Sequence, residues 1–178
     1  MSAFVRLIGA PLIGLVVVLL AQTSFAYDWQ VVAPGDGKYV IQMPGPPKES
    51  TQKIDTATGP ADLHQYVVEV GDEAYLSSYI EYADKIIASR SPQDHLKTAE
   101  GAFVKSFPGA TVRVEKDTNV GDYPGRVFVL DLTDGNVYTA CMYLVGRRLY
   151  QNVAATPKDR AGSPDVIKFL ESFTVYKE

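Results

Sequence analysis

The sequence is poor in the residues that most often build metal sites and nucleophilic catalytic centres. Its 178 residues include one cysteine, Cys141, and two histidines, His64 and His95. A lone cysteine cannot form an intrachain disulfide, and a transition-metal site usually needs three or four nitrogen, sulfur or oxygen ligands. We therefore expect no metal and no cofactor, and a fold that is held together by its hydrophobic core.

These three residues also have ordinary structural interpretations. His64 falls in a predicted strand, where a cross-strand or surface position is expected, and His95 falls in the first turn of a predicted helix, where an exposed position is expected. Cys141 lies in mid-strand, where a thiol usually behaves as a small buried hydrophobe. The sequence also lacks the Gly-x-Ser-x-Gly pattern of serine hydrolases and a glycine-rich phosphate loop. It therefore indicates no catalytic residue.

Basic charge is also scarce. There are 17 Lys and Arg residues against 21 Asp and Glu, which gives a formal net charge of −4, and no segment gathers the basic residues into a patch. Binding to nucleic acid depends on clustered Lys and Arg that neutralise phosphates. We therefore expect neither nucleic acid nor an anionic lipid surface as a partner.

Long apolar runs are confined to the N-terminal segment. Residues 7–21 are apolar but fall short of the roughly 20 residues that cross a membrane as a helix. Ser24 and Ala26 then place small residues at positions −3 and −1 of a cleavage site. Residues 1–26 are thus predicted to be a signal peptide that is cleaved before Tyr27, with an uncleaved anchor as the alternative. Cleavage leaves no integral membrane span and implies a periplasmic or secreted protein.

Residues 27–178 predict a single α+β domain in which an antiparallel β-sheet is combined with two main helices. Apolar residues alternate with the period of two that indicates strands, and turn signals such as Gly71-Asp72 and Asp134-Gly135 separate them. The last three strands form a meander, and we expect the helices to cover one side of the sheet. The predicted strands occupy residues 28–32, 37–43, 48–54, 61–70, 73–83, 110–120, 122–132, 136–145 and 147–156.

The two helices begin with the same capping pattern. Ser91 precedes Pro92 and Asp94, and Ser163 precedes a second Pro and Asp. Apolar side chains three or four residues apart then fall on one helix face. These side chains are Leu96, Ala99, Phe103 and Phe107 in the first helix, and Val166, Leu170 and Phe173 in the second.

Three Pro-Gly pairs punctuate the chain and are expected to form its corners. They follow Met43, Phe107 and Tyr123. Proline sets the φ angle of the second residue of a turn, and glycine accepts the positive φ that a type II turn needs next. The third pair is therefore expected to launch the strand that begins with Arg126.

The order of these elements resembles the Mog1/PsbP-like fold. The resemblance rests on Trp29 in the first strand, on residues 39–47, on the capped helix at 91–107, on the Tyr-Pro-Gly-Arg meander and on the terminal helix around 169–173. Proteins of this fold include an accessory subunit of photosystem II, a nuclear transport factor that binds a small GTPase, and many exported bacterial relatives of unknown function. The resemblance implies an accessory or binding domain without catalytic activity, and it transfers no ligand residue.

Three residues are candidates for binding. Tyr79 and Tyr143 would lie on an open sheet face if helices cover only the other, although tyrosine in strands often simply packs. Arg126 could bind an anion or a partner carboxylate, or form a salt bridge within the domain. We expect an exported domain that binds an envelope protein, in an oligomeric state that the sequence leaves open. The alternatives are a small-ligand carrier, which requires a large apolar cavity, and an enzyme whose site places His64 or His95 beside a carboxylate.

Overall fold

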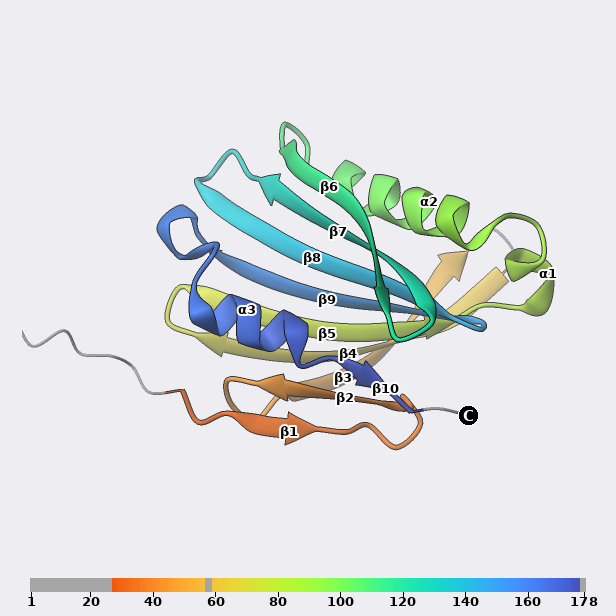
Figure 1. Cartoon of the computed structure of the whole chain (residues 1–178), viewed down its shortest axis with the longest axis horizontal. Helices are drawn as coiled ribbons and strands as arrows, with labels where there is room; N and C mark the ends of the chain where they lie inside the picture. The colour runs from red at the N-terminus through yellow and green to blue at the C-terminus, as the bar shows by residue number, and fades with distance from the viewer. Residues whose placement is uncertain (1–26, 57–58, 177–178) are drawn as a thin grey trace, which may run out of the picture.

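The computed structural model of the chain describes residues 27–56 and 59–176 (Figure 1). The signal peptide predicted over residues 1–26 lies outside the described residues. The elements follow one another as β1 (Gln30–Val32), β2 (Tyr39–Met43), β3 (Lys48–Thr56), β4 (Gly59–Val70), β5 (Glu73–Glu81), α1 (Asp84–Ile87), α2 (Pro92–Lys105), β6 (Thr111–Val120), β7 (Tyr123–Asp131), β8 (Asn136–Val145), β9 (Arg148–Pro157), a 3₁₀ turn (Lys158–Arg160), α3 (Pro164–Glu171) and β10 (Thr174–Val175).

The strands form two antiparallel sheets. The large sheet has seven strands in the order β3-β4-β5-β9-β8-β7-β6, and the small sheet has three in the order β1-β2-β10. The predicted meander is confirmed as β7-β8-β9. Several hairpins turn on a glycine with positive φ, such as Gly71 and Gly146, because two-residue turns between antiparallel strands need this conformation.

Both faces of the large sheet are covered. Helix α3 and the small sheet pack on one face, whereas α2 packs on the other (Figure 1). Side-chain alternation sends Tyr79, Cys141 and Tyr143 to the α3 side, and Phe128 and Met142 to the α2 side. The expectation that helices cover one side is therefore wrong, because the small sheet uses the first two strands and the last to build a third layer.

The predicted helix caps are confirmed. The Ser91 hydroxyl accepts a hydrogen bond from the Asp94 amide at 3.2 Å, and the Ser163 hydroxyl accepts one from the Val166 amide at 3.4 Å. Each bond satisfies an amide that the first helical turn leaves without a partner. Helix α1 was not predicted, and its four residues bury no side chain.

The Pro-Gly pairs behave differently from one another. Gly109 has a φ of +83° and closes the connection after α2, as predicted. Pro124 and Gly125 instead lie inside β7, and the turn before this strand is formed by Gly121 at a φ of +56° and by Asp122. The expected corner at residues 123–125 is therefore wrong, and Gly125 is instead required by the close approach of the Tyr143 ring.

Candidate functional site

A groove opens on the α3 side of the large sheet, between α3 and the β6-β7 hairpin. Its volume is about 500 Å³. The small sheet and α3 cover buried residues of β4, β5 and β9 on this side, and α3 is seen beside the large sheet in Figure 1. The strands nearest the β6 edge contribute to the lining of the groove. We call it the α3 groove, and it is lined by Lys116, Thr118, Asn119, Val120, Gly121, Val127, Cys141, Tyr143, Ile167, Leu170, Glu171 and Phe173.

The floor of the α3 groove contains a closely packed aromatic pair. The Tyr143 ring stacks on Phe173, with centroids 5.2 Å apart and an interplanar angle of 5°. On its other side the ring lies over Gly125, its register partner on β7, where a Cβ atom would collide with the ring. The ring therefore has little room to move, and its side chain is 7% exposed.

The groove contains no activated nucleophile. Cys141 is 5% exposed, and burial raises the pKa of its thiol to about 11. A thiol with such a pKa is protonated at neutral pH, and the thiolate is the nucleophilic form. Burial likewise raises the pKa of the Tyr143 hydroxyl. The interpretation of Cys141 as a small buried hydrophobe is thus supported.

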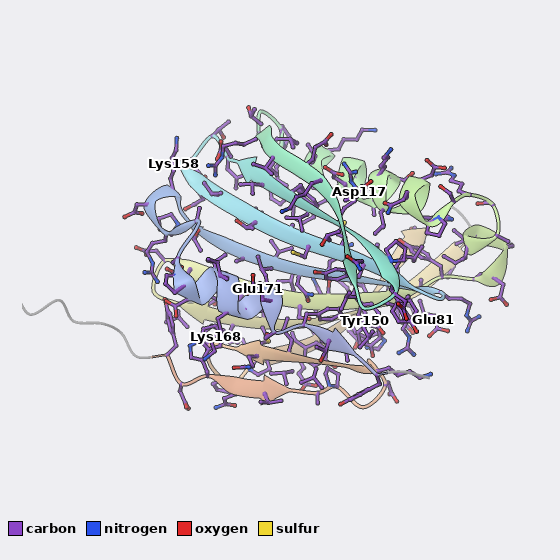
Figure 2. All side chains as sticks on the ribbon, viewed as in Figure 1. Glu81, Asp117, Tyr150, Lys158, Lys168 and Glu171 are labelled. Atoms are coloured by element: carbon purple, nitrogen blue, oxygen red, sulfur yellow. The ribbon has the colours of Figure 1, made fainter. Side chains whose placement is uncertain are left out.

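The rim of the groove is mixed in charge and contains one exposed apolar residue. Lys116 and Glu171 provide one charge of each sign, and Glu171 is seen on α3 in Figure 2. Ile167 of α3 is 47% exposed, since it lies off the helix face that buries Val166 and Leu170. Sequence reasoning missed Ile167. Its position outside the apolar stripe of Val166, Leu170 and Phe173 was the pattern that could have indicated an exposed apolar side chain.

Tyr79 does not lie on an open face. Its side chain is 4% exposed and lies beneath Tyr39 of β2, with ring centroids 6.1 Å apart. The His64 ring stacks on the Tyr79 ring with centroids 4.5 Å apart, and the Arg148 guanidinium lies 5.4 Å from the Tyr79 ring centroid. The expected open, tyrosine-bearing face is therefore wrong, because the small sheet covers it. Tyr143 is buried as well, although it contributes to the groove floor.

Arg126 is occupied by carboxylates of its own domain. Its side chain is 7% exposed, and its Nε atom pairs with Glu100 of α2, which is 6% exposed. Its terminal nitrogens lie 2.8 Å from Asp117 and 3.3 Å from Glu115, and Asp117 lies beside α2 (Figure 2). Burial raises the pKa of Glu100, and Arg126 opposes that shift. The alternative of a salt bridge within the domain is thus confirmed, and the guanidinium is engaged on both of its edges.

A second buried carboxylate ties together three distant segments. Glu73, 7% exposed, accepts hydrogen bonds from the hydroxyls of Tyr27 (2.9 Å) and Tyr75, and pairs with Arg160 at 2.7 Å. Burial alone would raise the pKa of Glu73, but these hydrogen bonds lower it below its ordinary value of 4.5. The cluster fastens residue 27 to the large sheet and to the 3₁₀ turn.

The two histidines each make one polar contact outside the α3 groove. His64 Nδ1 lies 3.0 Å from the Thr51 hydroxyl, and His95 Nε2 lies 3.2 Å from the Ile87 carbonyl. Within residues 27–56 and 59–176, no group of three or more His, Cys, Asp or Glu side chains could hold a metal ion. In the same part of the chain, no helix combines the length and the apolar composition needed to cross a membrane.

Comparison with known proteins identifies the fold. The sequence matches no described protein family, and no curated protein sequence is similar to it. The solution structure of cyanobacterial PsbP from Synechocystis sp. PCC 6803 superposes with a TM-score of 0.56 at 14% identity, over 87% of this chain and 96% of that chain.

Two further structures give lower scores. Protein PA94 of unknown function from Pseudomonas aeruginosa has a TM-score of 0.47 at 9% identity, over 84% of this chain and 97% of its own. The Ran-binding protein Mog1p of Saccharomyces cerevisiae has a TM-score of 0.42 at 13% identity, over 84% and 96%. On the likeness to cyanobacterial PsbP, this chain has the Mog1/PsbP-like α+β fold that its sequence indicated.

Proposed function

We propose that the chain is an exported, non-catalytic domain that binds an envelope protein through the α3 groove. The observation that carries the proposal is the juxtaposition of a preformed apolar floor with Ile167, which is 47% exposed beside it. Protein-binding sites are typically built from such an apolar centre inside a polar rim. Lys116 and Glu171 supply that rim.

The dimensions of the groove suit an inserted side chain of a partner. A volume of about 500 Å³ lies within the range of pockets that bury a ligand or an anchoring residue. The floor is held by the stack of Tyr143 on Phe173, so little ordering is required on binding. A partner that presents an apolar anchor flanked by charges of both signs is the expected occupant.

Export is supported by the pattern of residues 1–26 and by the use of cysteine. The only cysteine, Cys141, is buried, so an oxidising compartment would not cross-link the protein through an exposed thiol. N-terminal sequencing of the protein recovered outside the cytoplasm should begin at Tyr27. Recovery of a membrane-bound form with Met1 intact would contradict the signal peptide and favour the anchor.

The binding proposal can be tested by comparing two variants that exchange an exposed apolar residue for a charge. Ile167→Asp alters the rim of the α3 groove, whereas Val31→Asp alters β1, where Val31 is 70% exposed. A partner captured from the envelope fraction should be retained by the wild type and by Val31→Asp, and lost by Ile167→Asp. Loss of an anchoring contact of about 2 kcal/mol corresponds to a roughly 30-fold weaker complex. Equal retention by both variants would exclude the α3 groove.

A further inference from the structure

A second hollow lies on the opposite side of the large sheet, beneath the short helix α1. Its volume is about 540 Å³. We call it the α1 pocket. Its apolar lining consists of Ile54 of β3, Tyr82 after β5, Ile86 of α1, Ala99 of α2, Leu144 of β8 and Leu149 of β9.

The pocket exists because the covering helices leave part of the sheet unfilled. Helix α2 packs on β7 and β8, near one end of the seven-stranded order. Two of the α2 residues that line the hollow, Ala99 and Ala102, have side chains too small to reach across to the next strands. Helix α1 comes next, but it has only four residues and buries none of them. Leu144 and Leu149 are only 3% and 2% exposed, so they close the bottom of the hollow, and its accessible apolar surface belongs to the residues of its walls.

Basic side chains stand at the mouth of this apolar hollow. Lys85 of α1 and Arg90 of the connection to α2 both line it, and Asp55 is the acidic residue of the lining. Arg90 is positioned by a hydrogen bond from its Nη1 atom to the Thr98 hydroxyl, at 3.0 Å. The mouth is therefore locally positive on a chain whose formal net charge is −4.

The lining of the pocket also contains a phenol. The Tyr82 side chain belongs to the lining, and burial raises the pKa of its hydroxyl. The phenol therefore stays protonated at neutral pH and can donate to an anionic oxygen. His95 lines the same pocket, and its ring nitrogen contacts the Ile87 carbonyl at 3.2 Å, which ties α2 to the end of α1.

We propose that the α1 pocket binds a small amphipathic anion, an aliphatic carboxylate of medium chain length. The chain of the ligand lies against the half-buried side chains of Ile54, Ile86 and Ala99, and its carboxylate meets Lys85 and Arg90. The volume falls within the range of about 300–1,000 Å³ that is typical of small-molecule sites. Arg and Lys at an apolar mouth recognise a carboxylate through charge-assisted hydrogen bonds, whereas a neutral ligand forms only weaker hydrogen bonds with them.

This site is independent of the α3 groove, since the two hollows lie on opposite faces of the large sheet and share no lining residue. Binding of the anion therefore does not require a protein partner. Ile167→Asp should leave it unchanged, so that failure of one proposal does not imply failure of the other.

The experiment compares octanoate with octanol by calorimetry and by amide chemical shifts on the intact domain. Octanoate should bind, and shifts should gather at Ala99, Leu144 and Leu149. Octanol should bind at least about tenfold more weakly, because it lacks the charged hydrogen bonds. The variant Lys85→Glu/Arg90→Glu should reduce the affinity for octanoate by a similar factor or more.

The matched control is Lys97→Glu, which reverses one exposed charge on α2 next to the Arg126 cluster rather than at the α1 pocket. It should leave octanoate binding unchanged. Ala102→Trp places a large side chain into the hollow from an exposed position and should abolish binding while the domain remains folded. The proposal would be overturned if the wild type bound no octanoate or bound octanol with equal affinity. It would also be overturned if the double variant bound octanoate as well as the wild type, or if the chemical shift changes centred on Leu170.

Discussion

The ring of Tyr143 lies across Gly125, the residue opposite it on the neighbouring strand. A Cβ atom at Gly125 would meet both the ring and the Met142 carbonyl oxygen, the latter at 2.8 Å. The glycine is therefore required by the close approach of a side chain rather than by its own φ angle. The same ring stacks on Phe173 in the α3 groove, with an interplanar angle of 5°.

Gly125→Ala should destabilise the domain by about 1–3 kcal/mol, the usual cost of forcing additional atoms into a packed site. The measurement is the free energy of unfolding in urea. Gly101→Ala is the control, because a Cβ there meets nothing within 4 Å and lies in α2. It should raise stability by about 0.5–1 kcal/mol, since alanine is the better helix residue. Equal effects of the two changes would contradict the packing described for Tyr143.

Arg126→Met should destabilise the domain strongly. The change leaves Glu100 buried without its cation, and such a loss typically costs about 3–5 kcal/mol. Arg126→Met/Glu100→Leu should recover much of this loss, because no isolated charge then remains inside. Removal of the partly exposed pair between Arg113 and Asp131, by Arg113→Met, should cost about 1 kcal/mol, less than the loss at Arg126. A small effect of Arg126→Met would argue for an accessible guanidinium and revive its role in binding.

Stability should fall in acid partly through Glu73. Its pKa in the folded state lies below the ordinary value of 4.5, so the folded state takes up the proton less readily than the unfolded state. The resulting stabilisation is complete above about pH 4.5 and is lost as the pH falls through the folded pKa. Glu73→Gln should therefore be less stable than the wild type at pH 7 and should decline less steeply below pH 4.5.

The control for this experiment is Glu171→Gln, which removes an exposed carboxylate of α3 and makes the same change in net charge. Urea unfolding of the three proteins between pH 3 and pH 7 gives the comparison. A Glu73→Gln curve that stays parallel to the wild-type curve at every pH would show that Glu73 does not titrate differently in the two states.

Cys141 should react slowly in the native protein. Its thiol has a pKa of about 11 and is 5% exposed, so little thiolate is available to iodoacetamide at pH 7.5. Labelling followed by mass spectrometry should be slow in buffer and fast in urea. Cys141→Ala should lower the free energy of unfolding by about 1 kcal/mol and leave partner binding intact. Fast native labelling, or lost binding without lost stability, would assign the thiol a function.

The local pattern of apolar and polar residues was sufficient to predict most of the strands and helices. It also predicted which side chains of a strand share a face. Alternation correctly paired Tyr143 with Cys141 and Tyr138 with Met142, because in a strand the period of two is imposed by backbone geometry alone. The caps at Ser91 and Ser163 were equally predictable, since a capping residue acts on amides only two or three positions away.

Long-range pairing was not predictable in the same way. Val40 of β2 pairs with Thr174 of β10, and no periodicity within either segment records that contact. Because that pairing builds the small sheet, the burial of Tyr79 could not be foreseen. Gly125 shows a related limit. Pro-Gly is a frequent turn signal, but position 125 requires a glycine because the Tyr143 ring of the neighbouring strand lies against it. Ile167 acquires its position beside the α3 groove only through the docking of α3.

The most direct measurement of the central claim is site-specific photo-crosslinking in the intact envelope, with a photoreactive phenylalanine analogue placed at 167 or at 31. Both positions are exposed, and they lie on α3 and β1 respectively. The analogue at position 167 should give a discrete protein adduct, whose mass distinguishes an envelope partner from a second copy of this chain, and the analogue at position 31 should not. An adduct at 31 without one at 167, or a second copy as the species captured at 167, would contradict the account.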